Sequence, residues 1–198
     1  GARGAALAAA VGSAGVAFYL VTHALGVNLT VVPEALPEVW WRYPVLILAA
    51  LEKRGVDPAS FTLQMPNAIL IEYTCVGRYI YPPAHGLRIA TDVIEYVIRN
   101  HPHWVPIAVV SAQLYAARAN PVQELAFGFS IAMQYLDAVL ARGFAIDDVA
   151  PYFSFITGVD MDFFEAVAKL RAYRKIWAKL MRERYGATKP ESLRLRLM

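Results

Sequence analysis

The sequence has a single cysteine, Cys75, and only 18% of its 198 residues are charged. One cysteine excludes a disulfide scaffold and a cysteine zinc site, and it favours a reducing compartment, here taken as the cytoplasm. The low charge accompanies 58% hydrophobic residues, which excludes a disordered chain. The net charge of +3 comes with no Lys/Arg stripe free of acidic neighbours. Nucleic-acid binding is therefore not expected.

No charged residue lies between Arg3 and Glu34. The apolar stretch 5–25 is long enough for a membrane helix, which needs about 20 apolar residues. It is, however, rich in weakly hydrophobic alanine, contains His23, and has only Arg3 as a basic flank. We therefore expect a buried helix of an α/β domain, with a membrane or targeting segment as the alternative.

Common catalytic motifs are also missing, since the sequence has no GxGxxG, Walker loop, GxSxG or HExxH. His101 and His103 have no nearby carboxylate or third histidine and predict a solvated turn. Asp160 and Asp162 begin a predicted helix, where carboxylates favour the positive end of the dipole. No metal site is expected. Four basic residues are predicted to form the solvated face of that helix: Lys169, Arg171, Arg174 and Lys175.

Short β-rich runs alternate with longer helical patterns along the chain. Predicted strands cover 27–32, 61–65, 105–111, 152–157 and 193–197. Predicted helices cover 37–51, 68–76, 87–100, 121–142 and 161–185. Asn67 is expected to cap one helix, and Gly77, Gly143 and Gly186 to end three. This alternation predicts an α/β fold with a parallel sheet, either open or closed as a barrel.

Several separated motifs stand in a fixed order: Asn67-Ala68-Ile69-Leu70-Ile71-Glu72-Tyr73, Tyr79-Ile80-Tyr81-Pro82-Pro83, Asn120-Pro121-Val122-Gln123-Glu124-Leu125-Ala126-Phe127, Ala150-Pro151-Tyr152-Phe153-Ser154-Phe155, and Asp162-Phe163-Phe164-Glu165-Ala166-Val167-Ala168-Lys169-Leu170-Arg171-Ala172. This series resembles the substrate-binding barrel of the methylmalonyl-CoA mutase family. The resemblance implies a TIM-type (β/α) barrel with acyl-CoA along its axis. It also implies adenosylcobalamin, bound mainly by a separate domain, and an isomerase that rearranges acyl-CoA through radicals.

The resemblance assigns few functional residues to this chain. The positions of the family's catalytic histidine and glutamate carry Leu114 and Ala117, and the carboxylate-binding arginine is Val76. No catalytic residue is therefore assigned. Three polar residues remain as expected acyl-CoA contacts: Ser154, Gln64 and Gln113. The position just before Ser192, where the resemblance implies a lysine near the CoA, carries Glu191. Phe163, Phe164, Leu170 and Trp177 are expected to be core.

The resemblance also implies missing parts. No Asp-x-His-x-x-Gly motif supplies a lower cobalamin ligand, and five strands cannot close an eight-stranded barrel. We therefore expect residues 1–198 to form one partial barrel domain of about five βα units, without the B12-binding domain. The expected partners are a B12-binding subunit or the remaining barrel segment, in a homo- or hetero-oligomer. The chain alone is not expected to catalyse the rearrangement. The alternatives are a non-catalytic scaffold or partner subunit and, less favoured, a small membrane-associated protein.

Overall fold

The computed structural model describes residues 51, 53–60, 62–77, 79 and 81–198. Its described strands form one parallel sheet in the order β1 (Ile107–Val110), β2 (Phe153–Ile156) and β3 (Arg196–Leu197). Ile107 pairs with Phe153, and Ser154 pairs with Arg196. Gln64 forms a further parallel bridge with Val105, supported by backbone hydrogen bonds between Val105 and both Leu63 and Met65. Four parallel segments therefore lie side by side in the order of the chain, which agrees with the predicted α/β fold.

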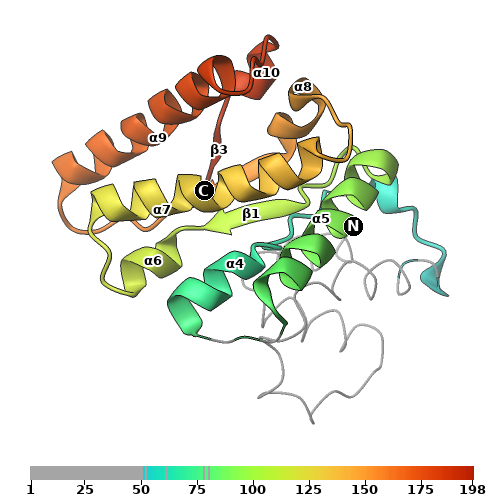
Figure 1. Ribbon diagram of the computed structural model, residues 1–198, viewed down its shortest axis with the longest axis horizontal. Helices are drawn as coiled ribbons and strands as arrows, with labels where there is room; N and C mark the ends of the chain where they lie inside the picture. The colour runs from blue at the N-terminus through green and yellow to red at the C-terminus, as the bar shows by residue number, and fades with distance from the viewer. Residues whose placement is uncertain (1–50, 52, 61, 78, 80) are drawn as a thin grey trace.

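Helices connect these strands. The long ones are α5 (Pro83–Asn100), α7 (Pro121–Leu140) and α9 (Phe163–Glu183). Shorter helical segments are η3 (Pro58–Ser60), α4 (Ile69–Ile71), η4 (Glu72–Val76), α6 (Ala112–Ala116), α8 (Ile146–Val149), η5 (Ala150–Tyr152) and α10 (Pro190–Leu193). In Figure 1, β1 points toward the end of the molecule where α7 and α9 begin. The helices therefore run opposite to the strand that precedes them, as in βαβ units.

The hydrophobic core lies between the sheet and these helices. Ile107, Val109, Phe153 and Phe155 are at most 1% exposed and belong to one cluster with residues of α5, α7 and α9. Phe155 packs against Tyr173 and Trp177 of α9 at ring-centroid distances of 5.6 and 5.9 Å. Because side chains alternate along a strand, the residues between them face the opposite side of the sheet.

The predicted helices 121–142 and 161–185 correspond to α7 and α9, whose ends lie within two residues of the predicted limits. Asn120 accepts a hydrogen bond from the Gln123 amide, and the Gln123 side chain accepts one from the Asn120 amide, which completes a capping box. Asp162 caps α9 by accepting from the Glu165 amide. Gly77, Gly143 and Gly186 all have the positive φ expected where a helix ends.

Three helix predictions were wrong in detail. Asn67 is not the cap, because the α4 helix begins one residue later and the buried Asn67 amide donates to the Ala90 carbonyl. The helix predicted from Leu87 begins at Pro83, where proline fits the first turn because it lacks an N–H. The segment predicted as one helix over 68–76 changes at Glu72 into the wider π-turn η4.

All four strands predicted within the described part of the chain are shorter than expected, and two of them are reduced most. The pattern at 61–65 yields pairing only around Gln64, and the alternation at 193–197 yields the two-residue β3, because Leu193 ends α10. The predicted strand 27–32 and the apolar stretch 5–25 lie outside the described residues. Within the described part of the chain, no helix combines the length and hydropathy that a bilayer crossing requires.

Candidate functional site

The carboxyl ends of β1 and β2 bring polar side chains together. Ser111 follows β1 directly and Thr157 follows β2 directly, so both lie at the same edge of the parallel sheet. The helices α7 and α9 begin at this edge (Figure 1). Ligands of parallel α/β folds bind at the carboxyl ends of the strands. This edge is therefore the candidate site.

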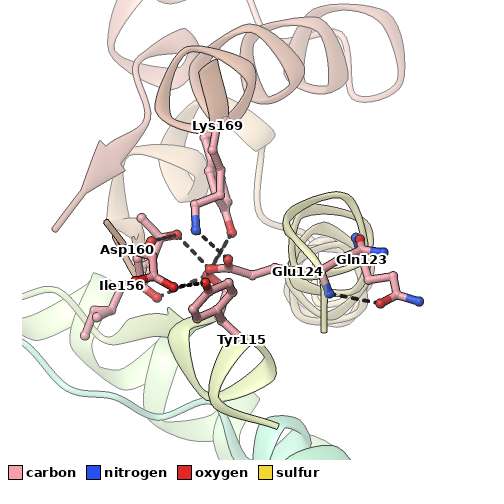
Figure 2. A network of polar contacts seen from close by, with 11 residues as sticks. Tyr115, Gln123, Glu124, Ile156, Asp160 and Lys169 are labelled. Carbon is pink, nitrogen blue, oxygen red and sulfur yellow. Dashed lines mark hydrogen bonds and ion pairs between the residues drawn. The ribbon is translucent and has the colours of Figure 1, made fainter. Parts of the chain in front are cut away.

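Glu124 is the centre of a buried network on the helix side of this edge (Figure 2). Its side chain is fully buried, and the Thr157 hydroxyl donates to its Oε1 at 2.7 Å. The Ser111 hydroxyl lies 3.1 Å from the same oxygen. The position of Glu124 in the first turn of α7 places its carboxylate at the positive end of the helix dipole.

Lys169 of α9 neutralises this carboxylate. Its Nζ donates to Glu124 Oε2 at 2.7 Å, and the two side chains are 5% and 0% exposed. The prediction that Lys169 belongs to a solvated face was therefore wrong, whereas Arg171, Arg174 and Lys175 are exposed as predicted. A buried charge is retained only when it is paired and hydrogen-bonded, as it is here.

Tyr173 and Gly128 complete the network. The Tyr173 hydroxyl lies 2.8 Å from Ser111 Oγ, and burial raises the pKa of Tyr173 to about 12, so the hydroxyl stays protonated. Gly128 lies one turn after Glu124, where an added Cβ would be 3.2 Å from Ser111 Cβ. The glycine therefore lets α7 approach the end of β1 closely enough for Glu124 to reach Ser111.

Two predicted site residues meet on the opposite face of the sheet. Gln64 Nε2 donates to Ser154 Oγ at 3.0 Å, and the Ser154 hydroxyl donates to the Ile107 carbonyl at 3.0 Å. Ser154 is 1% exposed, whereas Gln64 is partly exposed. An amide and a hydroxyl without a titratable group can bind a polar ligand atom. They cannot exchange protons with it at neutral pH.

The third predicted contact, Gln113, lies at the start of α6. Its Oε1 is buried and has no hydrogen-bond partner among the described residues. Among the described residues, the Gln113 side chain forms no hydrogen bond with Gln64 or Ser154. Leu114, which stands at the expected histidine position, is 6% exposed and belongs to the main hydrophobic core. Ala117 and Val76 are exposed.

Of the aromatic residues of α9 that were expected in the core, one is buried and two are exposed. Trp177 is buried as expected, and its Nε1 donates to the Ser192 carbonyl. Phe163 and Phe164, expected in the core, are 70% and 82% exposed. They lie in the first turn of α9, at the end of the molecule where the helix begins (Figure 1). The prediction of buried packing was wrong for this pair.

His101 is less solvated than predicted. Its ring stacks on Trp104 at 4.3 Å, and burial lowers its pKa. His103 is exposed in the same turn. No group of three potential metal ligands occurs within the described residues.

Comparisons with known proteins identify the family. The family model "Methylmalonyl-CoA mutase" matches residues 7–198. The chain is 40% identical over 155 residues to methylmalonyl-CoA mutase of Escherichia coli, covering 77% of this chain and 22% of that protein. It is 37% identical over 172 residues to the 2-hydroxyisobutanoyl-CoA mutase large subunit of Aquincola tertiaricarbonis, covering 87% and 30%.

A third relative is ethylmalonyl-CoA mutase of Methylorubrum extorquens, 37% identical over 147 residues that cover 72% of this chain and 21% of the relative. The chain thus spans less than a third of the length of each of these relatives. The matched family model covers nearly all of its residues. The chain belongs to the methylmalonyl-CoA mutase family.

Proposed function

We propose that this chain is an acyl-CoA-binding part of a mutase that rearranges acyl-CoA thioesters, and that it acts with further polypeptide. The single observation that carries this proposal is the Gln64–Ser154 hydrogen bond. It joins two residues that the family resemblance assigns to acyl-CoA, on the face of the sheet away from the helices. In a closed (β/α) barrel that face lines the interior. We propose that the parallel segments described above are part of such a barrel.

Neither Gln64 nor Ser154 carries a titratable group, and among the described residues the side-chain hydrogen bonds of the pair join it only to the Ile107 carbonyl. The role of this chain in the reaction is therefore to bind the substrate and exclude water from it. Leu114 cannot donate a hydrogen bond to a thioester carbonyl, and Val76 cannot pair with a substrate carboxylate. A monocarboxylic acyl group fits this pattern better than a dicarboxylic one.

Adenosylcobalamin supplies the radical chemistry of this family when it is bound. The described residues do not fit its lower ligand. His101 Nε2 is buried in the turn that leads into β1, beside Trp104. His85 and His103 are exposed, and neither ring is oriented by a hydrogen bond within the described part of the chain. A histidine that ligates a metal normally has its second nitrogen hydrogen-bonded. We propose that a B12-binding subunit, or another barrel segment with such a domain, associates with this chain in the cytoplasm.

Isothermal titration with coenzyme A tests the proposed binding. We expect micromolar affinity in the unsubstituted chain and none in Ser154→Ala, because the Gln64 amide then loses its partner. Ser130→Ala is the matched control, since Ser130 is exposed on α7 and bonds only within its own helix. No binding by the unsubstituted chain, or equal binding by Ser154→Ala, contradicts the proposal.

A second candidate is a non-catalytic scaffold or partner subunit derived from the barrel. The burial of Leu114 in the core favours it, because this position then serves packing rather than the substrate. We expect the isolated chain to isomerise no acyl-CoA even with adenosylcobalamin. Turnover, or an organic-radical and cobalt(II) EPR signal when substrate is added, would contradict that expectation. Turnover that appears only with a B12-binding partner favours the mutase over the scaffold.

A further inference from the structure

The loop 157–162 connects β2 to α9 and crosses the carboxyl edge of the sheet. Thr157, its first residue, donates to Glu124, and Asp162, its last, caps α9. Between these two anchors, Val159 and Met161 are 63% and 95% exposed. The middle of the loop is therefore not held by burial of its own apolar side chains.

Tyr115 of α6 contacts the middle of the loop. Its hydroxyl donates to Asp160 Oδ2. A Cβ added to Gly158 would lie 3.3 Å from Cδ1 of the Tyr115 ring, so the loop backbone passes close to this side chain. The hydrogen bond from Tyr115 is also the main reason why the pKa of Asp160 is below its usual value.

The same tyrosine contacts the buried ion pair. Lys169 Nζ lies 4.9 Å from the centroid of the Tyr115 ring while it donates to Glu124 (Figure 2). Asp160 is oriented on its other side, because its Oδ1 accepts the Met161 amide at 2.7 Å. Tyr115 therefore links the loop to the network that joins α7, α9 and the end of β1.

We propose that Tyr115 is the positioning residue that fixes the loop 157–162 across the carboxyl edge of the sheet, through its hydrogen bond to Asp160 and its ring contacts with Gly158 and Lys169. The further idea that the fixed loop lies beside a bound acyl-CoA rests on the proposed function. The attachment of the loop to Tyr115 is independent of the proposed function.

Hydrogen–deuterium exchange of the full chain, resolved to peptides that cover 157–162, tests the attachment. Tyr115→Phe keeps the ring and removes the hydroxyl. We expect exchange in the loop to rise about tenfold, the effect of losing one hydrogen bond to a charged acceptor. Exchange in β1 and α7 should not change. Tyr152→Phe is the matched control, because Tyr152 precedes the first residue of β2 whereas the loop follows the last.

Asp160 tests the same contact from the exposed side, where a substitution leaves the core intact. Asp160→Ala should raise loop exchange as much as Tyr115→Phe does, and the double variant should add nothing further. Asp160→Asn keeps an acceptor oxygen and should restore most of the protection. Unchanged loop exchange in Tyr115→Phe, or an additive double variant, overturns the proposal. A positive exchange result with no coenzyme A binding leaves this inference standing and removes the proposed function.

Discussion

Glu124 and Lys169 lie 45 residues apart on neighbouring helices and form a 2.7 Å ion pair inside the protein. The carboxylate also accepts a hydrogen bond from the Thr157 hydroxyl, in the loop after β2. One buried pair thus joins α7, α9 and the carboxyl edge of the sheet. Removing one partner leaves the other charge buried without compensation.

Lys169→Met should therefore lower the free energy of unfolding by about 3–5 kcal/mol. The double variant Glu124→Gln/Lys169→Met should recover most of this loss, because it removes both charges and keeps an acceptor for the Thr157 hydroxyl. Urea unfolding followed by tryptophan fluorescence measures both values. Lys175→Met on the exposed face of α9 is the control and should change stability by less than about 0.5 kcal/mol. Equal stability of Lys169→Met and the control would contradict the assignment.

Gly86→Ala should destabilise the protein, although alanine normally favours a helix over glycine by about 1 kcal/mol. The reason is that a Cβ at Gly86 would collide with the buried Tyr73 hydroxyl and press on Ile69 Cδ1. Thermal unfolding should show a lower Tm for Gly86→Ala. Adding Tyr73→Phe removes the colliding oxygen and should recover part of the loss. An unchanged or raised Tm in the single variant would show that Tyr73 moves aside.

Trp177→Ala should lower the free energy of unfolding far more than Phe164→Ala, although both replace aromatic residues of α9. Trp177 is 1% exposed and packs on Phe153 and Phe155, so its removal should cost about 3–5 kcal/mol. Phe164 is 82% exposed and should cost less than about 0.5 kcal/mol. Denaturant unfolding measures the difference. A large loss in Phe164→Ala would mean that this side chain is covered in solution.

Asp147 should stabilise the protein at neutral pH and lose this contribution in acid. The hydroxyl and amide of Thr188 and the amide of Lys189 donate hydrogen bonds to its carboxylate and hold the pKa of Asp147 well below its usual value. A carboxylate whose folded pKa is lowered contributes stability above its unfolded pKa and loses it as the pH falls through the folded value. Asp147→Asn should therefore lower the free energy of unfolding at pH 7. The difference in this free energy between the variant and the unsubstituted chain should become smaller as the pH falls below about 4. A difference that does not change with pH would contradict this linkage.

Local signals explain which elements the sequence predicted well. Asn120 and Asp162 are capping residues, and Gly143 and Gly186 end the helices that they begin. These limits depend on residues within one turn of each other, so they are visible without the fold. The start of α5 was missed, because Pro82 and Pro83 indicate either a turn or a first helical turn.

The site residues depend on contacts between distant segments. Lys169 shares the spacing of the buried residues Ala166, Tyr173 and Trp177, and this periodicity could have indicated its burial. Its partner Glu124 could not be found in this way, because the pairing requires α7 and α9 to lie side by side. Phe163 was misplaced because periodicity does not reveal where a helix extends past the sheet.

The order of the sheet repeats the order of the chain, from the Gln64 bridge through β1 and β2 to β3. During synthesis, each of these strands emerges after the neighbour with which it pairs has already left the ribosome. No described strand has to wait for a partner nearer the carboxyl terminus before it can join the sheet. The described sheet can therefore grow in one direction, one βα unit at a time. Each strand, and β3 after the others, adds to an edge that has already formed.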